Sequence, residues 1–418
     1  MSNEYSERPD WAERLRRDRE VRSWSRADAV AALRTFSDVP LPDGLVDQWD
    51  LWERGRNKPD EFYRPLIATT FGTVVESIFP SRRLPLPSQT RDERLLSRSG
   101  IDTHELVQRI RGSSIDATTI DALELTIEQL CCEYARRDAT ELITESREWL
   151  SDITHLLDER LPLSRHKNVL DAAGWLSLLI GCLEYDTGHY QAAEAARKQA
   201  LQIADEATNA SISGWAHELR AWFALTNGRY REVIEASHAG QDVAPGRAVS
   251  VQLLAQEAKA WARMANQRNG LRALEKCRTL LDSLPYPERP DNHFVIEPDK
   301  FDFYAMDCYR LIGDDRLAET LAREIIKKAT AFDGTDISPM RKAEAELTLG
   351  VIAARHGTVD DALGYGRQAL SINRRSQPTL LMVGSELDHA LRQRYPDNAE
   401  VQHFHNSLTD IAATTRTR

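Results

Sequence analysis

Residues 175–200 read WLSLLIGCLEYDTGHYQAAEAARKQA, and this stretch decides the fold that we expect for the chain. It contains an apolar helical segment, a polar turn at Gly188, and a second helical segment that carries Ala193. Gly181 and Ala193 have almost no side chain, so two helix backbones can approach closely where they cross. A positive φ is easily adopted by glycine, which makes Gly188 a natural end for the first helix. The stretch therefore predicts a helical hairpin.

The same pattern occurs in five copies between Trp175 and Leu370. The turn glycines lie 40, then 85, then 44 residues apart, at Gly188, Gly228, Gly313 and Gly357. The longest interval spans a third copy that has lost its turn glycine and is marked by Ala260, Gln267 and Ala273. A period of this length predicts a solenoid of helical hairpins. Because a solenoid presents an extended concave surface, the pattern favours recognition over catalysis.

Composition limits the classes of protein to consider. The 418 residues suffice for two or three domains, and the net charge of −11 argues against a protein that coats nucleic acid nonspecifically. Residues 1–83 are the less acidic end, with 14 Lys/Arg against 15 Asp/Glu. The five cysteines form no CxxC pair, which predicts reduced, buried thiols. With no signal-peptide pattern and no long apolar run, we expect a cytoplasmic protein without a membrane partner.

We expect an all-α chain in three parts. Residues 9–78 form a small head, residues 79–100 a proline-rich linker, and residues 101–418 a repeat domain with C-terminal capping helices. Apolar spacing and caps predict four head helices, at 10–21, 26–33, 45–54 and 61–71. Four tryptophans of the head are expected in its core: Trp11, Trp24, Trp49 and Trp52.

The third head helix ends in Trp52–Glu53–Arg54–Gly55, followed by Arg56–Asn57–Lys58–Pro59. This stretch resembles the closing signature of Xre/Cro-type helix-turn-helix domains, and residues 15–25 resemble their first helix and the cap of the second. Together with residues 285–309, the layout resembles actinobacterial Xre-type regulators with C-terminal tetratricopeptide repeats over nearly the whole chain. The resemblance implies a helix-turn-helix head on a tetratricopeptide-type α-solenoid. It also implies DNA-binding control of transcription, often of development or secondary metabolism, gated by the repeats.

Several head side chains are candidates for binding DNA as a homodimer on an operator. Gln48 could read adenine, and the candidate phosphate contacts are Arg16, Arg22, Arg26, Arg54, Arg56 and Lys58. However, phosphates would repel Asp43, Asp47 and Asp50 around the third helix. The preceding loop is also about nine residues longer than this kind of domain usually has. The alternative is a protein-interaction scaffold whose degenerate head no longer binds DNA.

In each first helix, we expect the side chains six and three positions before the small crossing residue, and one and four positions after it, to face the concave groove. The set contains Trp175, Tyr185, Trp215, Glu218, Trp222, Glu257, Trp261, Phe303, Asp307 and Arg310, with Cys182, Leu225, Met264 and Lys300 beside them. Because Trp and Arg are typical binding anchors, we expect the groove to bind a peptide, a small molecule or a protein. The alternative is that the tryptophans fill the solenoid core.

One irregular segment, Leu284–Asp299, interrupts the repeat with four prolines. An insert of this kind within a solenoid is uncommon unless it has a role. We weigh a lid over the groove or a partner-binding element against a loop that packs on a neighbouring hairpin.

Catalytic and cofactor motifs do not stand out. The chain has no phosphate-binding glycine loop, no HExxH motif and no Ser/His/Asp order, and Glu400, His403 and His405 are read as solvated surface. We therefore expect no enzyme activity, no cofactor and no metal. The expected mechanism is a shift between head arrangements, driven by a groove ligand that binds one of them better.

Overall fold

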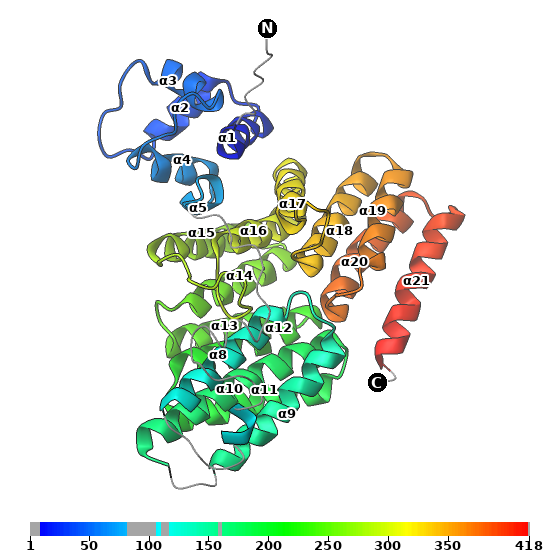
Figure 1. The fold of residues 1–418 in the computed structure, drawn as a ribbon. Coiled ribbons are helices and arrows are strands. Elements are labelled where there is room, and N and C mark those ends of the chain that lie inside the picture. Colours follow the sequence, from blue (N-terminus) through cyan, green and yellow to red (C-terminus); the bar gives the residue numbers. More distant parts are fainter. Residues whose placement is uncertain (1–8, 82–105, 110–116, 158–160, 417–418) are drawn as a thin grey trace.

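The computed structural model describes residues 9–81, 106–109, 117–157 and 161–416. These residues form helices and connecting segments, and their one β-type contact is an isolated bridge between Thr330 and Asp336. Figure 1 shows a small helical head on a curved array of helical hairpins, which we call the body. The expected all-α, solenoid-like fold is confirmed. All five cysteines are buried and free.

The head consists of short helices packed around aromatic side chains. Its helices are α1 (Asp10–Val21), α2 (Arg26–Arg34), α3 (Leu45–Glu53), α4 (Tyr63–Phe71) and α5 (Val75–Ile78). Ser25 starts α2 with a capping box, in which Asp28 N donates to Ser25 Oγ at 3.1 Å and Ser25 N donates to Asp28 Oδ2 at 2.8 Å. Gly72 ends α4 with a φ of 67°. Trp49 and Trp52 are buried, with Trp11 and Trp24 packed against them, so the expected tryptophan core is confirmed.

The body is a series of antiparallel hairpins. Its helices are α8 (Ala117–Glu133), α9 (Ala139–Leu157), α10 (Leu163–Asp186), α11 (Tyr190–Ala207), α12 (Ala210–Thr226), α13 (Tyr230–Val243), α14 (Ala248–Arg263), α15 (Gln267–Ser283), α16 (Pro298–Ile312), α17 (Asp315–Ala329), α18 (Pro339–His356), α19 (Val359–Ser371), α20 (Gln377–Arg394) and α21 (Ala399–Arg416). The five copies read from the sequence correspond to the hairpins from α10–α11 to α18–α19. A Cβ at Gly350 would lie 3.3 Å from the Ala362 carbonyl oxygen, which shows how closely the paired helices approach. Most of the expected linker, from residue 82 onward, lies outside the described residues.

The array closes on itself through α20. Arg374, just before α20, donates to Asp186 Oδ2 at 2.9 Å and to the Tyr134 carbonyl at 3.0 Å. Trp222 Nε1 on α12 donates to Thr379 Oγ1 on α20 at 3.2 Å. These bonds join the end of the array to its first hairpins, so the concave face becomes a partly enclosed space.

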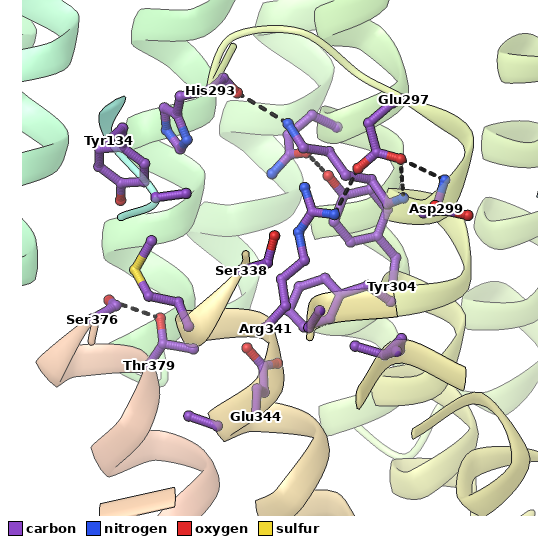
Figure 2. A pocket seen from close by; sticks show the side chains of 18 of the residues that line it. Tyr134, His293, Glu297, Asp299, Tyr304, Ser338, Arg341, Glu344, Ser376 and Thr379 are labelled. Carbon is purple, nitrogen blue, oxygen red and sulfur yellow. Dashed lines mark hydrogen bonds and ion pairs between the residues drawn. The ribbon is translucent and has the colours of Figure 1, made fainter. Parts of the chain in front are cut away.

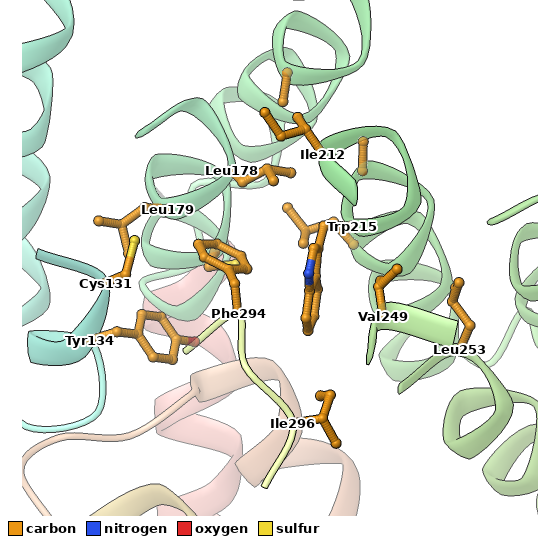
Figure 3. Close-up of a cluster of buried hydrophobic side chains, with 14 of the residues drawn as sticks. Cys131, Tyr134, Leu178, Leu179, Ile212, Trp215, Val249, Leu253, Phe294 and Ile296 are labelled. Atoms are coloured by element: carbon orange, nitrogen blue, oxygen red, sulfur yellow. The ribbon is translucent and has the colours of Figure 1, made fainter. Parts of the chain in front are cut away.

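The segment between α15 and α16 lies inside this space. Phe294 is 6% exposed, and its ring centroid lies 5.3 Å from those of both Trp175 and Trp215. Figure 3 shows Phe294 next to Trp215. His293 stacks on Tyr134 at 3.7 Å between ring centroids. The segment therefore fills the first part of the concave face. Of the two alternatives, packing against neighbouring hairpins describes it better than a lid.

The head docks on the body through charged side chains. α1 packs on α17 and α5 packs on α16, whereas α2 and α3 lie on the far side of the head (Figure 1). Arg14 on α1 is buried and lies 2.8 Å from Asp302 on α16, which also accepts a 2.7 Å hydrogen bond from Thr73. Arg17 forms an ion pair with Glu324 on α17. The head is thus held by buried ion pairs.

Candidate functional site

The space left in the second part of the concave face is a cavity of about 560 Å³, which we call the central cavity. Its walls come from α12, α14, α16, α17, α18 and α20, together with side chains from residues 132–136 and 289–293. Figure 2 shows side chains from several of these elements converging on it. The volume falls within the range typical of small-molecule sites, roughly 300–1,000 Å³.

One wall of the central cavity is apolar and aromatic. Trp215, Trp222 and Phe303 line it, with Met340 and Met382 from the returning helices. Trp222 is half-buried, and its indole N–H is occupied by the hydrogen bond to Thr379. This wall can therefore offer ring surface to a ligand without leaving a polar atom unpaired.

The opposite part of the cavity is built around Glu297, the N-cap of α16. Its Oε2 accepts from Asp299 N at 2.6 Å and Lys300 N at 3.2 Å, and Arg341 Nη1 donates to its Oε1 at 2.6 Å. Lys300 Nζ donates to the carbonyl of His293 at 3.0 Å and also to that of Val295. Burial, with the nearby charge of Arg341, lowers the pKa of Lys300 to about 7.

Glu218 illustrates how the sequence places a buried acid on this surface. It points from α12 toward α14, where Gln256 Nε2 donates to it at 2.7 Å and Gln252 Nε2 at 3.2 Å. Gln252 and Gln256 are four residues apart, so they share one face of α14 and reach the same carboxylate. Burial raises the pKa of Glu218, and the two amides offset only part of this effect.

Four residues of the predicted groove line the central cavity: Trp215, Glu218, Trp222 and Phe303. The neighbouring Leu225 and Lys300 also line it. The structure brings these side chains together from hairpins that are distant in sequence. Counting from the small crossing residue therefore identified cavity residues on α12 and α16.

The other six predicted groove residues lie outside the lining of the central cavity. Trp175 packs on Phe294, and Tyr185 is buried, stacking on Phe223 at 3.9 Å between ring centroids. Trp261 Nε1 donates to Glu257 at 3.2 Å. Asp307 and Arg310 are fully buried, in an ion cluster with Arg263 and Glu386. Asp307 and Arg310 thus take part in contacts between helices, whereas the bond from Trp261 to Glu257 lies within α14.

Sequence reasoning missed the wall that α18 and α20 supply. Arg341, Ser338 and Thr379 all line the cavity. A signal existed for part of this wall, since counting back six and three residues from Gly350 reaches Glu344 and Leu347, and both line it. The contribution of α20 has no such signal, because it depends on closure of the array.

The candidate DNA-binding residues differ in how far their side chains contact the rest of the head. Arg22 donates to the carbonyls of Phe71 at 2.7 Å and Asp18 at 2.8 Å, so it ties α1 to α4 instead of projecting into solvent. Lys58 is exposed, 6.0 Å from the Phe79 ring, and burial lowers its pKa. Gln48 is half-buried.

The remaining candidates lie at the head surface. Asp50 lies between two of them, 2.8 Å from Arg26 and 2.8 Å from Arg54. Arg16 pairs with Glu20 at 2.7 Å, and Arg56 is exposed with no partner among the described residues. Asp50 is therefore neutralised, whereas Asp43 and Asp47 are exposed and form no ion pair in the described part of the chain.

Within the described ranges, no group of three His, Cys, Asp or Glu side chains is arranged to hold a metal ion. None of the described helices has both the length and the apolar character needed to cross a bilayer. No family model matches the chain, and no curated protein in the comparison is similar to it.

Proposed function

We propose that this protein is a cytoplasmic, DNA-binding transcriptional regulator whose body senses a small molecule. The observation that carries the proposal is that the central cavity and the head share a wall. Asp302, Glu324 and Lys328 line the cavity, and the first two pair with Arg14 and Arg17 of the head. Lys328 Nζ also donates to the Ser77 carbonyl at 3.4 Å. A molecule bound in the cavity therefore has a direct physical route to the head.

The proposed mechanism is a population shift. A ligand that touches Asp302 or Glu324 changes the free energy of head docking, and by linkage docking changes ligand affinity by the same factor. In this view the head is a helix-turn-helix unit with α3 as its recognition helix. The far side of the head, with Arg16, Arg26, Arg54 and Arg56, would face an operator, and a homodimer would place two heads on successive turns of the duplex.

The cavity has the size of a small-molecule site, which favours a small molecule over a peptide or protein as the ligand. A second candidate function is a protein-interaction scaffold. It is favoured by the exposed Asp43 and Asp47 and by two large apolar side chains in the loop before α3, Phe36 at 49% and Val39 at 50% exposure.

The decisive experiment is a selection of bound fragments from random DNA with the purified full chain at two salt concentrations. A reproducible inverted repeat whose binding weakens steeply with salt supports the regulator. The double variant Arg54→Glu and Arg56→Glu should lose most of this binding. The matched control is Arg323→Glu, which changes an exposed arginine on α17 that pairs with Glu319. Equal binding by the double variant and the control would exclude reading by this face and favour the scaffold.

A further inference from the structure

The acidic and basic side chains that line the central cavity differ in how they are paired. Each carboxylate in its lining already has a cation or an amide donor as partner: Asp291 with Arg289, Asp299 with Lys328, Asp302 with Arg14, Glu324 with Arg17, Glu297 with Arg341, Glu218 with two glutamines, and Glu344 with Lys259. The loosest of these pairs is Glu344 with Lys259, at 3.9 Å. Five of these seven carboxylates therefore have a close cation, whereas Glu218 has only neutral amide donors and Glu344 Oε1 accepts no hydrogen bond among the described residues.

Some of the cations in the cavity lining have no carboxylate partner. Arg136, Lys300 and Arg375 line the cavity, and none of them lies within 4.0 Å of a carboxylate in the described part of the chain. Lys300 is held by two carbonyls, which share its protons but carry no charge to neutralise it. These three cations can therefore accept the charge of a bound anion.

Two of the lining cations, Lys300 and Arg341, contact Glu297. Its two oxygens accept from the backbone N–H groups of Asp299 and Lys300 and from one guanidinium nitrogen of Arg341, which Figure 2 shows beside Glu297. Arg341 carries five N–H donors, and Nη1 is the one nitrogen with an acceptor among the described residues. Burial is the main cause of the low pKa of Lys300, the charge of Arg341 adds to it, and a bound anion would favour the charged lysine.

We infer that the central cavity binds a small amphiphilic carboxylate. Its carboxylate lies at Lys300 and Arg341, where the guanidinium can donate two hydrogen bonds to it. Its apolar part lies along Trp215, Trp222 and Phe303, and the volume of about 560 Å³ accommodates a chain or ring system of drug-like size. This inference rests on the proposed function only in taking the cavity as the ligand site.

The test is calorimetric titration of the full chain, without DNA, with three probes that share one apolar tail: decanoate, 1-decanol and decyltrimethylammonium. We expect decanoate to bind about tenfold or more tighter than decanol, since it alone makes charge-assisted hydrogen bonds, and the cation not to bind. Equal affinity for decanoate and decanol, tighter binding of the cation, or no binding of any probe would overturn the ligand class.

Variants locate the carboxylate. Arg341→Gln should bring decanoate affinity down to that of decanol and leave decanol binding unchanged. The matched control is Arg355→Gln on the same helix, where the guanidinium pairs with Asp315 outside the cavity lining. Because Arg341→Gln leaves Glu297 short of a partner, Lys300→Met provides a second test, with circular dichroism to verify folding. Unchanged decanoate affinity in both folded variants would contradict the assignment.

The outcomes separate this inference from the proposed function. Binding of decanoate with no effect on selected DNA would support the carboxylate site and count against ligand-controlled transcription. Sequence-specific DNA binding by a chain that binds none of the three probes would support the regulator and overturn the carboxylate site.

Discussion

The two halves of the concave face show what a closed solenoid does with its interior. In the first half, Phe294 fills the space between Trp175 and Trp215. In the second half, the central cavity remains, lined by Lys300, Arg341 and an aromatic wall. The first half is complete without a partner, because apolar contacts satisfy it. The second keeps uncompensated positive charge, which is costly in a buried place unless a partner arrives.

We expect the largest effect on stability from a substitution in the first half of the concave face, which Phe294 fills. Phe294→Ala should lower the free energy of unfolding by about 3–5 kcal/mol, because it removes a buried ring and leaves a void between two tryptophans. Urea denaturation followed by circular dichroism measures the change. Phe332→Ala, at a fully exposed position, is the control and should change little. A loss below about 1 kcal/mol would mean that this half collapses or rehydrates easily.

The second prediction concerns the boundary between the cavity and the head. Asp302→Ala removes the partner of buried Arg14 and should cost about 3 kcal/mol or more of head docking. Hydrogen exchange in α1 and α5 should accelerate while α10 to α13 stay protected. Lys327→Ala, which removes an exposed pair with Asp10, should leave exchange unchanged. If Asp302→Ala leaves α1 protected, the shared wall does not hold the head.

The third prediction concerns the pH dependence of ligand binding in the second half, where the central cavity lies. Burial and Arg341 lower the pKa of Lys300 to about 7, so the free protein loses this positive charge as pH rises through 7. Decanoate binding should therefore weaken between pH 6 and 8, by at most about tenfold per pH unit. Titrations at four pH values measure the slope.

Among the other groups around Lys300, Glu218 is a buried acid whose pKa burial also raises, so a variant is needed to assign the slope. Arg341 stays charged in the range, burial keeps the pKa of His293 well below its usual value, and Glu297 and Glu218 are the facing acids. Lys300→Met should therefore abolish the pH dependence and retain weaker binding. A slope that persists in this variant would assign the titration to another group.

The smallest expected effect tests closure of the array. Trp222→Phe keeps most of the aromatic wall but removes the indole donor to Thr379, and should cost about 1 kcal/mol. Thermal unfolding measures it, and Trp261→Phe, whose indole bonds to Glu257 outside the cavity lining, is the comparison. Equal cavity affinity for decanoate in both variants would show that this single bond does not control closure.

Local features of the chain were predictable from residues that act over a few positions. Ser25 and Asp28 cap α2, Gly72 ends α4, and Gly350 meets Ala362, because caps, turns and close crossings depend on neighbouring side chains. The hairpin period followed from the spacing of such small residues. These are properties that a sequence can state without knowing how the hairpins stack.

The sequence by itself therefore determined an all-α chain, its hairpins and the aromatic core of the head. Only the tertiary structure decided which side chains reach the central cavity. Asp307 and Arg310 have the spacing of groove residues, yet they are buried in an ion cluster with Arg263, whereas Arg341 becomes a cavity residue. The physical reason is that small rotations between successive hairpins accumulate along the array. Closure through α20 then joins residues more than 150 positions apart, such as Trp222 and Thr379, which no local pattern can pair.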